Sequence, residues 1–208
     1  LCVAGTHGKT TTTSMCTHIF MAAEADPTVM IGGTLPLLHS GYRVGQGDTI
    51  ILESCEYCNS FLSFFPTVAV ILNVEADHLD FFKDLDDIKR SFHRFAELVP
   101  PGGHVVVNAD NGGARDAAQG LDAFTFGLEP GADCTAVNLQ ENQGRPSFDI
   151  HVHGAFYAHA DLKVFGRHNV SNALAAASAA YVLGIPGKAV EAGIGSFTGA
   201  ARRFQYKG

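Results

Sequence analysis

The chain opens with a short apolar run, residues 1–4, which leads directly into Gly-Thr-His-Gly-Lys-Thr at residues 5–10 and then into a segment with helical periodicity. In a strand–loop–helix unit of this kind, backbone N–H groups and the positive end of the helix dipole converge on one point and bind phosphate. Gly5 and Gly8 permit the tight turn. Lys9 is placed to reach β- and γ-phosphates, and the Thr10 hydroxyl to bind Mg²⁺. We therefore expect a site for a nucleoside triphosphate, ATP, at this loop.

The loop departs from the general phosphate-loop pattern in one respect. In G-x-x-x-x-G-K-[ST] the first glycine would fall at position 3, which is Val3 in this chain. The alternative interpretation is an ordinary glycine-rich turn with a solvated lysine. The strand before the loop and the helix after it favour phosphate binding.

Strand-like and helix-like segments alternate through the first two-thirds of the chain, which predicts a helix-flanked, mostly parallel sheet of the phosphate-loop type. We expect strands over residues 1–4, 28–31, 48–53, 67–73, 104–108 and 123–126, and helices over residues 10–25, 84–98, 110–119, 169–183 and 187–194. From residue 134 to 164 polar and apolar residues alternate instead. This pattern predicts an antiparallel β extension with one solvated face.

Charge, apolar runs and cysteine content limit the classes of function that this chain can have. The formal net charge is −7 and no run of basic residues occurs, so nucleic acid is not an expected partner. No apolar stretch approaches the roughly 18 residues of a membrane-spanning helix. The five cysteines are an odd number, and no secretory signal precedes them. These features predict a reduced, cytoplasmic protein.

Two polar residues follow predicted strands and are candidate metal ligands. Glu53 ends one strand, and His78 lies just beyond another. Ligands gather at the carboxyl ends of parallel strands, so both side chains could face the phosphate loop. The alternative is that each only terminates its strand. Cys55 and Cys58 form a C-x-x-C pair, but the sequence offers no second pair of cysteine or histidine ligands at a suitable spacing. A structural zinc site needs four ligands, so this pattern argues against one.

Three separated segments, residues 4–12, 73–80 and 166–173, together resemble the central ATPase domain of the Mur ligases of peptidoglycan synthesis, and residues 199–204 match that family's link into its third domain. The resemblance spans residues 1–208. It implies a phosphate loop shorter than the general pattern, which explains why Val3 stands where that pattern has its first glycine. It implies that a precursor-binding domain before this segment and a Rossmann-like domain after it lie outside the chain. We therefore expect one domain of a longer enzyme.

The resemblance implies an ATP-dependent amide-forming ligase that proceeds through an acyl phosphate. The branch of the family that joins L-alanine to UDP-N-acetylmuramate is the best match. Lys9 would hold the phosphates, Thr10 and Glu53 one Mg²⁺, and His78 a second. The residues assigned to the nucleotide are Gly5, Thr6, His7, Gly8, Lys9, Thr10, Thr11, His168, Asn169, Asn172 and Arg203. Gly32–Gly33 and residues 56–61 would face the precursor.

Several alternatives remain open at this point. The helix after His78 lacks the modified lysine of several relatives, which favours the alanine-adding branch but leaves the ligands of the second metal undefined. A muropeptide-recycling ligase, a folate or cyanophycin relative, or a non-catalytic nucleotide-binding module would fit the same loop. Asn169 could simply cap its helix, and Arg203 could be a solvated side chain. The sequence does not define the oligomeric state.

Overall fold

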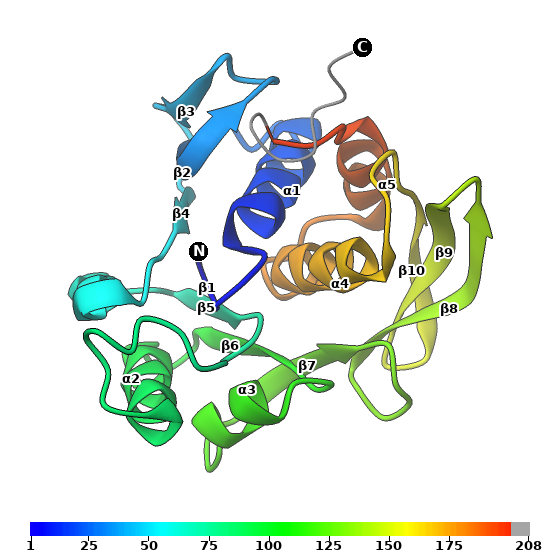
Figure 1. Ribbon diagram of the computed structural model, residues 1–208. Coiled ribbons are helices and arrows are strands. Elements are labelled where there is room, and N and C mark those ends of the chain that lie inside the picture. The colour runs from blue at the N-terminus through cyan, green and yellow to red at the C-terminus, as the bar shows by residue number, and fades with distance from the viewer. Residues whose placement is uncertain (201–208) are drawn as a thin grey trace.

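The computed structural model of the protein describes residues 1–200 and contains one ten-stranded mixed sheet with the strand order β10-β9-β8-β7-β6-β5-β1-β4-β2-β3 (Figure 1). The strands are β1 (Cys2–Ala4), β2 (Thr28–Leu35), β3 (Ser40–Arg43), β4 (Ile50–Glu53), β5 (Val68–Ile71), β6 (His104–Asn108), β7 (Ala123–Gly127), β8 (Cys134–Asn142), β9 (Arg145–Val152) and β10 (Ala155–Asp161). The strands from β2 to β8 across the centre are parallel, while β9 pairs antiparallel with both β8 and β10. The predicted fold class is confirmed.

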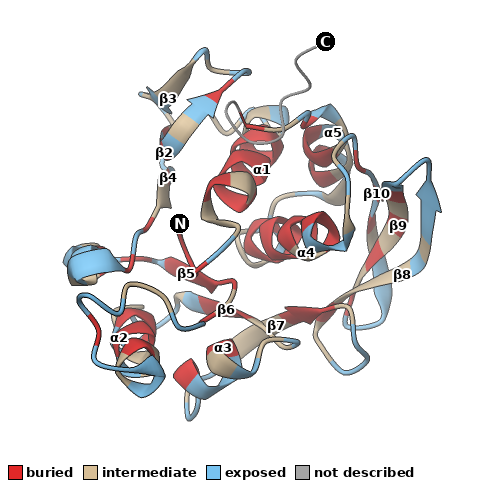
Figure 2. Ribbon diagram, viewed as in Figure 1, coloured by how far each residue is buried: buried red, intermediate tan, exposed pale blue. Residues whose placement is uncertain are grey.

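Helices cover the two faces of the sheet in separate groups. They are α1 (Lys9–Ala22), α2 (Leu85–Glu97), α3 (Gly112–Ala117), α4 (Arg167–Val182) and α5 (Gly187–Ser196). Helices α1, α4 and α5 pack together on one face, and α2 and α3 lie on the other (Figure 1). In Figure 2 the central strands and the inward sides of these helices are buried. Strand β5 is buried along its whole length, as expected for a strand covered on both faces.

Three helices fit on one side of the sheet because α4, which packs against α1, α5 and the sheet, has mostly small side chains. Its sequence is rich in alanine, and its middle turns from Ala173 to Ala180 are fully or almost fully buried. Small side chains allow helix axes to approach closely. The same holds where α5 meets α1, because a Cβ added at Gly193 would lie 2.4 Å from the Cα atom of Ile19.

Two short elements were not predicted from the sequence. The edge strand β3 has a half-buried Ser-Gly-Tyr-Arg sequence without an apolar pattern. The 3-10 segment η1 (Tyr57–Ser63) is interrupted at Cys58 and Asn59, which both have left-handed backbone angles (φ 54° and 56°). Such conformations are unusual for residues other than glycine and concentrate at functional sites. Among the described residues, no helix is long and apolar enough to cross a membrane.

Candidate phosphate-binding site

The loop between β1 and α1 has a backbone that only glycine fits at two positions. Gly5 has φ 150° and Gly8 φ 86°. A Cβ at Gly5 would lie 2.9 Å from Cβ of Leu72, and one at Gly8 would lie 2.6 Å from Oδ1 of Asn172. Any side chain would therefore meet β5 on one side or α4 on the other. The loop is held between these two elements, with its N–H groups at the start of α1.

Asn73 fixes the conformation of the loop. Its side-chain carbonyl accepts a hydrogen bond from the backbone N–H of His7 (2.7 Å), and its amide donates to the carbonyl of His7 (3.0 Å). The backbone carbonyl of Asn73 accepts from Thr6 (3.0 Å), and the Thr6 hydroxyl accepts from the N–H of Glu75 (3.0 Å). Asn73 was not among the predicted site residues. Its position just beyond β5, separated from that strand only by Leu72, was the available signal, since β5 is the neighbour of β1.

The structure brings Thr10 and Glu53 together, as the sequence predicted for one metal site. The Thr10 hydroxyl donates to Oε1 of Glu53 at 2.9 Å, and the N–H of Gly32 donates to Oε2 at 2.8 Å. Glu53 is thus oriented from both sides by contacts to α1 and β2. A hydroxyl and a carboxylate are hard oxygen donors, which suit Mg²⁺. A Cβ at Gly32 would lie 2.9 Å from the same carboxylate, so Gly32 keeps this space open.

Lys9 is engaged by its own loop and by a buried carboxylate. Its Nζ donates to the carbonyl oxygens of Gly5 (2.5 Å) and Thr6 (3.3 Å) and to both oxygens of Glu56 (3.2 and 2.9 Å). Glu56 lies just before η1 and is 2 % exposed. The sequence analysis placed Glu56 only in a segment expected to face a precursor. Glu56 lies beyond the end of β4, past the strand-end position that made Glu53 a candidate ligand.

His78 lies at the same edge of the sheet. Its Nε2 is 3.9 Å from Oε1 of Glu56 and 4.0 Å from Oδ2 of Asp77, and its backbone is left-handed with φ 51°. Tyr57 packs beside it, with ring centroids 4.7 Å apart. The hydrogen bond from the Tyr57 hydroxyl to Asp80 (2.9 Å) raises the pKa of that hydroxyl. The sequence placed His78 near the loop, and the structure links it to the loop through Glu56.

Helix α4 forms one wall of the loop. The Thr12 hydroxyl donates to Oδ1 of Asn172 (3.3 Å), and the Asn172 amide donates to Oδ1 of Asn169 (3.1 Å). Asn169 does not cap the helix. Its amide donates to the carbonyl of Phe165 (2.8 Å), and the N-cap position is Gly166, which has no side chain. The capping alternative was therefore wrong, because the helix begins two residues earlier, at Arg167, than the pattern indicated.

The other predicted nucleotide ligands have fewer contacts. His168 is exposed in the first turn of α4, and its ring lies against Gly166. Thr11 is half-buried on α1. Arg203 lies outside the described residues.

Metal binding by this site would depend on phosphate. Within residues 1–200, no group of three or more His, Cys, Asp or Glu side chains is arranged to hold a metal by itself. This agrees with the donor set at Thr10 and Glu53, because Mg²⁺ typically uses one or two carboxylates together with substrate phosphates and water. The thiols of Cys55 and Cys58 are both free and exposed.

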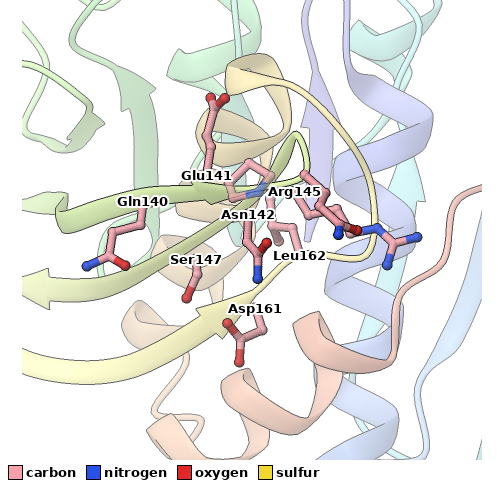
Figure 3. Close-up of a pocket in the computed structure, with 9 residues that line it drawn as sticks. Gln140, Glu141, Asn142, Arg145, Ser147, Asp161 and Leu162 are labelled. Atoms are coloured by element: carbon pink, nitrogen blue, oxygen red, sulfur yellow. The ribbon is translucent and has the colours of Figure 1, made fainter.

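A separate hollow lies in the antiparallel extension and is shown in Figure 3. It has a volume of about 540 Å³ and polar walls that include Glu141, Arg145 and Asp161. It is formed at β8, β9 and the end of β10, and β5, β6 and β7 separate β8 from β1. Its lining includes none of the predicted site residues, so it is not part of the phosphate-binding site.

The glycine loop, the helix N-terminus, Lys9 and the Thr10–Glu53 pair define this chain as a phosphate-binding α/β domain. Comparison with known proteins makes the assignment specific: residues 3–180 match the family model described as Mur ligase middle domain. The chain belongs to the Mur ligase family.

Two relatives and two solved structures illustrate the similarity. The chain is 44% identical over 210 residues to a UDP-N-acetylmuramate–L-alanine ligase of Clostridium novyi, covering 100% of this chain and 46% of the relative. It is 42% identical over 209 residues to the enzyme of the same name from Caldanaerobacter subterraneus, covering 99% of this chain and 45% of the relative. The chain thus spans about half the length of the curated relatives it matches.

Among solved structures, the UDP-N-acetylmuramate–alanine ligase of Thermotoga maritima superimposes with a TM-score of 0.85 at 29% identity, covering 98% of this chain and 46% of that one. A UDP-N-acetylmuramate:L-alanyl-gamma-D-glutamyl-meso-diaminopimelate ligase from Neisseria meningitides superimposes with a TM-score of 0.86 at 28% identity, covering 97% of this chain and 67% of that one.

Proposed function

We propose that this domain binds ATP with Mg²⁺ at the loop of residues 5–10, as the central domain of a ligase that joins L-alanine to UDP-N-acetylmuramate. The observation that carries the ATP site is the arrangement at the start of α1. The Thr10 hydroxyl lies 2.9 Å from the Glu53 carboxylate, and Lys9 lies one residue before Thr10 with its Nζ 2.5 Å from the Gly5 carbonyl. These groups supply a cation for phosphate and oxygen ligands for a metal at adjacent points.

In the proposed reaction, a carboxylate oxygen of UDP-N-acetylmuramate attacks the γ-phosphorus of ATP, and ADP leaves. The amine nitrogen of L-alanine then attacks the acyl carbon, the acyl–oxygen bond breaks, and inorganic phosphate leaves as the amide forms. When bound, Mg²⁺ supplies charge neutralisation between the phosphates. Lys9 and the loop N–H groups would orient the phosphates, Glu53 and Thr10 would hold one Mg²⁺, and His78 would bind a second. The chain's contribution is orientation and charge.

We assign the rest of the catalytic apparatus to segments beyond this domain. Relatives that match the whole chain are about twice its length. A precursor-binding domain on one side and a Rossmann-like domain on the other would complete the site, and Arg203 would reach the phosphates when they close. Alone, the 208-residue chain is expected to bind ATP–Mg²⁺ weakly and to catalyse little. Efficient ligation by this chain alone would contradict that assignment.

The second candidate is a muropeptide-recycling ligase, because the Neisseria meningitides structure superimposes as well as the Thermotoga maritima one. Sequence identity favours the alanine ligase, since relatives of that name reach 44% over the whole chain. Phosphate release by the full-length protein separates the two. It should require L-alanine together with UDP-N-acetylmuramate. Release that requires a muropeptide instead would favour recycling, and release without any acceptor would favour a non-catalytic nucleotide module.

The nucleotide site itself is tested by Lys9→Ala. Losing a charged donor to phosphate removes about 1.5–3 kcal/mol, which weakens ATP–Mg²⁺ binding by roughly ten- to a hundredfold. The measurement is titration calorimetry, with circular dichroism to show that the fold is retained. Lys188→Ala removes an exposed lysine from α5 and serves as the control, with unchanged affinity expected. Equal ATP affinity in wild type and Lys9→Ala would refute the loop assignment.

A further inference from the structure

One buried carboxylate, that of Glu56, lies beside the phosphate loop and is paired with Lys9. Glu56 has a side chain only 3% exposed, and its carboxylate contacts the Lys9 ammonium at 2.9 Å, whose own side chain is 15% exposed. Removing two charges from water to this degree is costly, and breaking such a pair from one side leaves the other charge uncompensated. The pair therefore affects any ligand that competes for Lys9.

Lys9 has no free donor in this arrangement. An ammonium group has three N–H donors, and those of Lys9 are used by the carbonyl oxygens of Gly5 and Thr6 and by Glu56. A phosphate that takes a hydrogen bond from Lys9 must replace one of these acceptors. Glu56 is the acceptor with the same charge as phosphate, so the two anions compete for one cation.

The position of Glu56 is fixed independently of Lys9. Its backbone carbonyl accepts from Asn59 (2.9 Å), and the carbonyl of Cys55 accepts from Phe61 (3.0 Å). Phe61 is completely buried against the rings of Phe92 and Phe95 on α2. The backbone that carries the Glu56 side chain is therefore held in place by contacts other than the ion pair with Lys9.

We propose that Glu56 is a positioning residue that makes the loop select metal-bound over metal-free triphosphate. This inference rests on the proposed ATP site. When metal-free ATP takes Lys9, Glu56 is left buried next to additional negative charge. Among residues 1–200, His78, with Nε2 3.9 Å from Oε1 of Glu56, is then the nearest basic group to it. When ATP arrives with Mg²⁺, the divalent cation at Thr10 and Glu53 supplies positive charge that offsets both anions.

The test compares two conditions on the 208-residue chain: calorimetric ATP affinity with excess Mg²⁺ and with EDTA. For Glu56→Gln, which keeps shape and removes charge, the affinity in EDTA should rise about tenfold, a factor that corresponds to about 1.4 kcal/mol. The affinity with Mg²⁺ should change little. The preference for metal-bound ATP should therefore fall about tenfold. A role in folding alone would lower both affinities or the melting temperature and would not raise affinity in EDTA.

Glu75→Gln is the matched control, because it removes the same charge at the same sheet edge from a side chain that is 53% exposed. Its preference for metal-bound ATP should stay close to that of wild type. If Glu56→Gln does not fold, Glu56→Asp decides. Its side chain is one methylene shorter, which withdraws the carboxylate from Lys9 and weakens the ion pair, so it should shift the preference in the same direction by less.

An unchanged preference in the folded Glu56 variant, or an equal fall in Glu75→Gln, would overturn the inference alone. Absence of ATP binding to wild type under both conditions would overturn the proposed function and this inference with it.

Discussion

Replacing Phe61 with leucine tests how the segment that carries Glu56 is held in place. The Phe61 ring is completely buried, stacks on Phe95 with centroids 4.7 Å apart and planes 8° apart, and meets the edge of Phe92 at 5.1 Å and 78°. Each aromatic pair contributes about 0.5–1.5 kcal/mol beyond burial. Losing both costs about 1–3 kcal/mol, to which the change of shape in a packed core adds about 1 kcal/mol.

The assay is urea unfolding followed by circular dichroism, with Phe148→Leu as the control. Phe148 is 1% exposed and belongs to the core on the opposite face of the sheet. Within the described residues its ring forms no aromatic pair, so this variant reports only the change of shape and burial. The free energy of unfolding of Phe61→Leu should fall about 1–3 kcal/mol further than that of Phe148→Leu.

An equal loss in the two variants would refute the argument that ring–ring contacts anchor this segment. A second readout is independent of global stability. Since Phe61 holds Glu56 against Lys9, the looser segment in Phe61→Leu should raise ATP affinity in EDTA, in the same direction as Glu56→Gln.

Two further predictions concern His18, which is part of α1, and Gly8, which lies at the N-cap of α1. Burial, reinforced by the charge of Lys163, lowers the pKa of His18 from 6.5 to about 4. The unfolded chain therefore binds a proton that the folded chain excludes, so stability should fall as the pH drops from about 6.5 to about 4. At about 1.4 kcal/mol per pKa unit, the loss should reach about 3 kcal/mol in urea titrations at pH 7 and pH 4. The His18→Gln variant should lack this component, and an identical pH dependence in both proteins would contradict the assignment. Gly8→Ala should lower ATP affinity at least about tenfold and lower the melting temperature, because its Cβ would lie 2.6 Å from Oδ1 of Asn172 at a positive φ. Gly195→Ala, which meets nothing within 4 Å, should leave ATP affinity unchanged, and equal effects would argue against a tightly walled loop.

Local signals in the sequence predicted the elements that build the site. The loop of residues 5–10 combined glycines, a lysine and a following helix, and the β-branched run Val68–Ile71 indicated a doubly covered strand, which the structure contains as β5. Position at the end of a parallel strand made Glu53 a candidate metal ligand near the loop. Its pairing with Thr10 came from the family resemblance, whereas the loop and the strands needed only periodicity and turn chemistry.

What the sequence did not reveal depends on contacts between distant segments. The ion pair of Lys9 and Glu56 depends on the path of the chain between β4 and η1, where Glu56 precedes the two left-handed residues Cys58 and Asn59. No propensity rule predicts that conformation at Cys58 and Asn59. Asn169 resembled a helix cap, and only the start of α4 at Arg167 shows that its side chain has a different partner.

The wall that α4 provides for the loop has a consequence for how this protein is made. Thr12 and Asn172 touch, yet they are 160 positions apart in the chain. During synthesis the glycine loop leaves the ribosome long before the helix that confines it, and such distant contacts form slowly. A nascent chain that stops short of α4 has every residue of the loop motif but lacks the surface against which Gly8 packs. Capture on immobilised ATP would therefore separate nascent chains that include α4 from chains stalled before it.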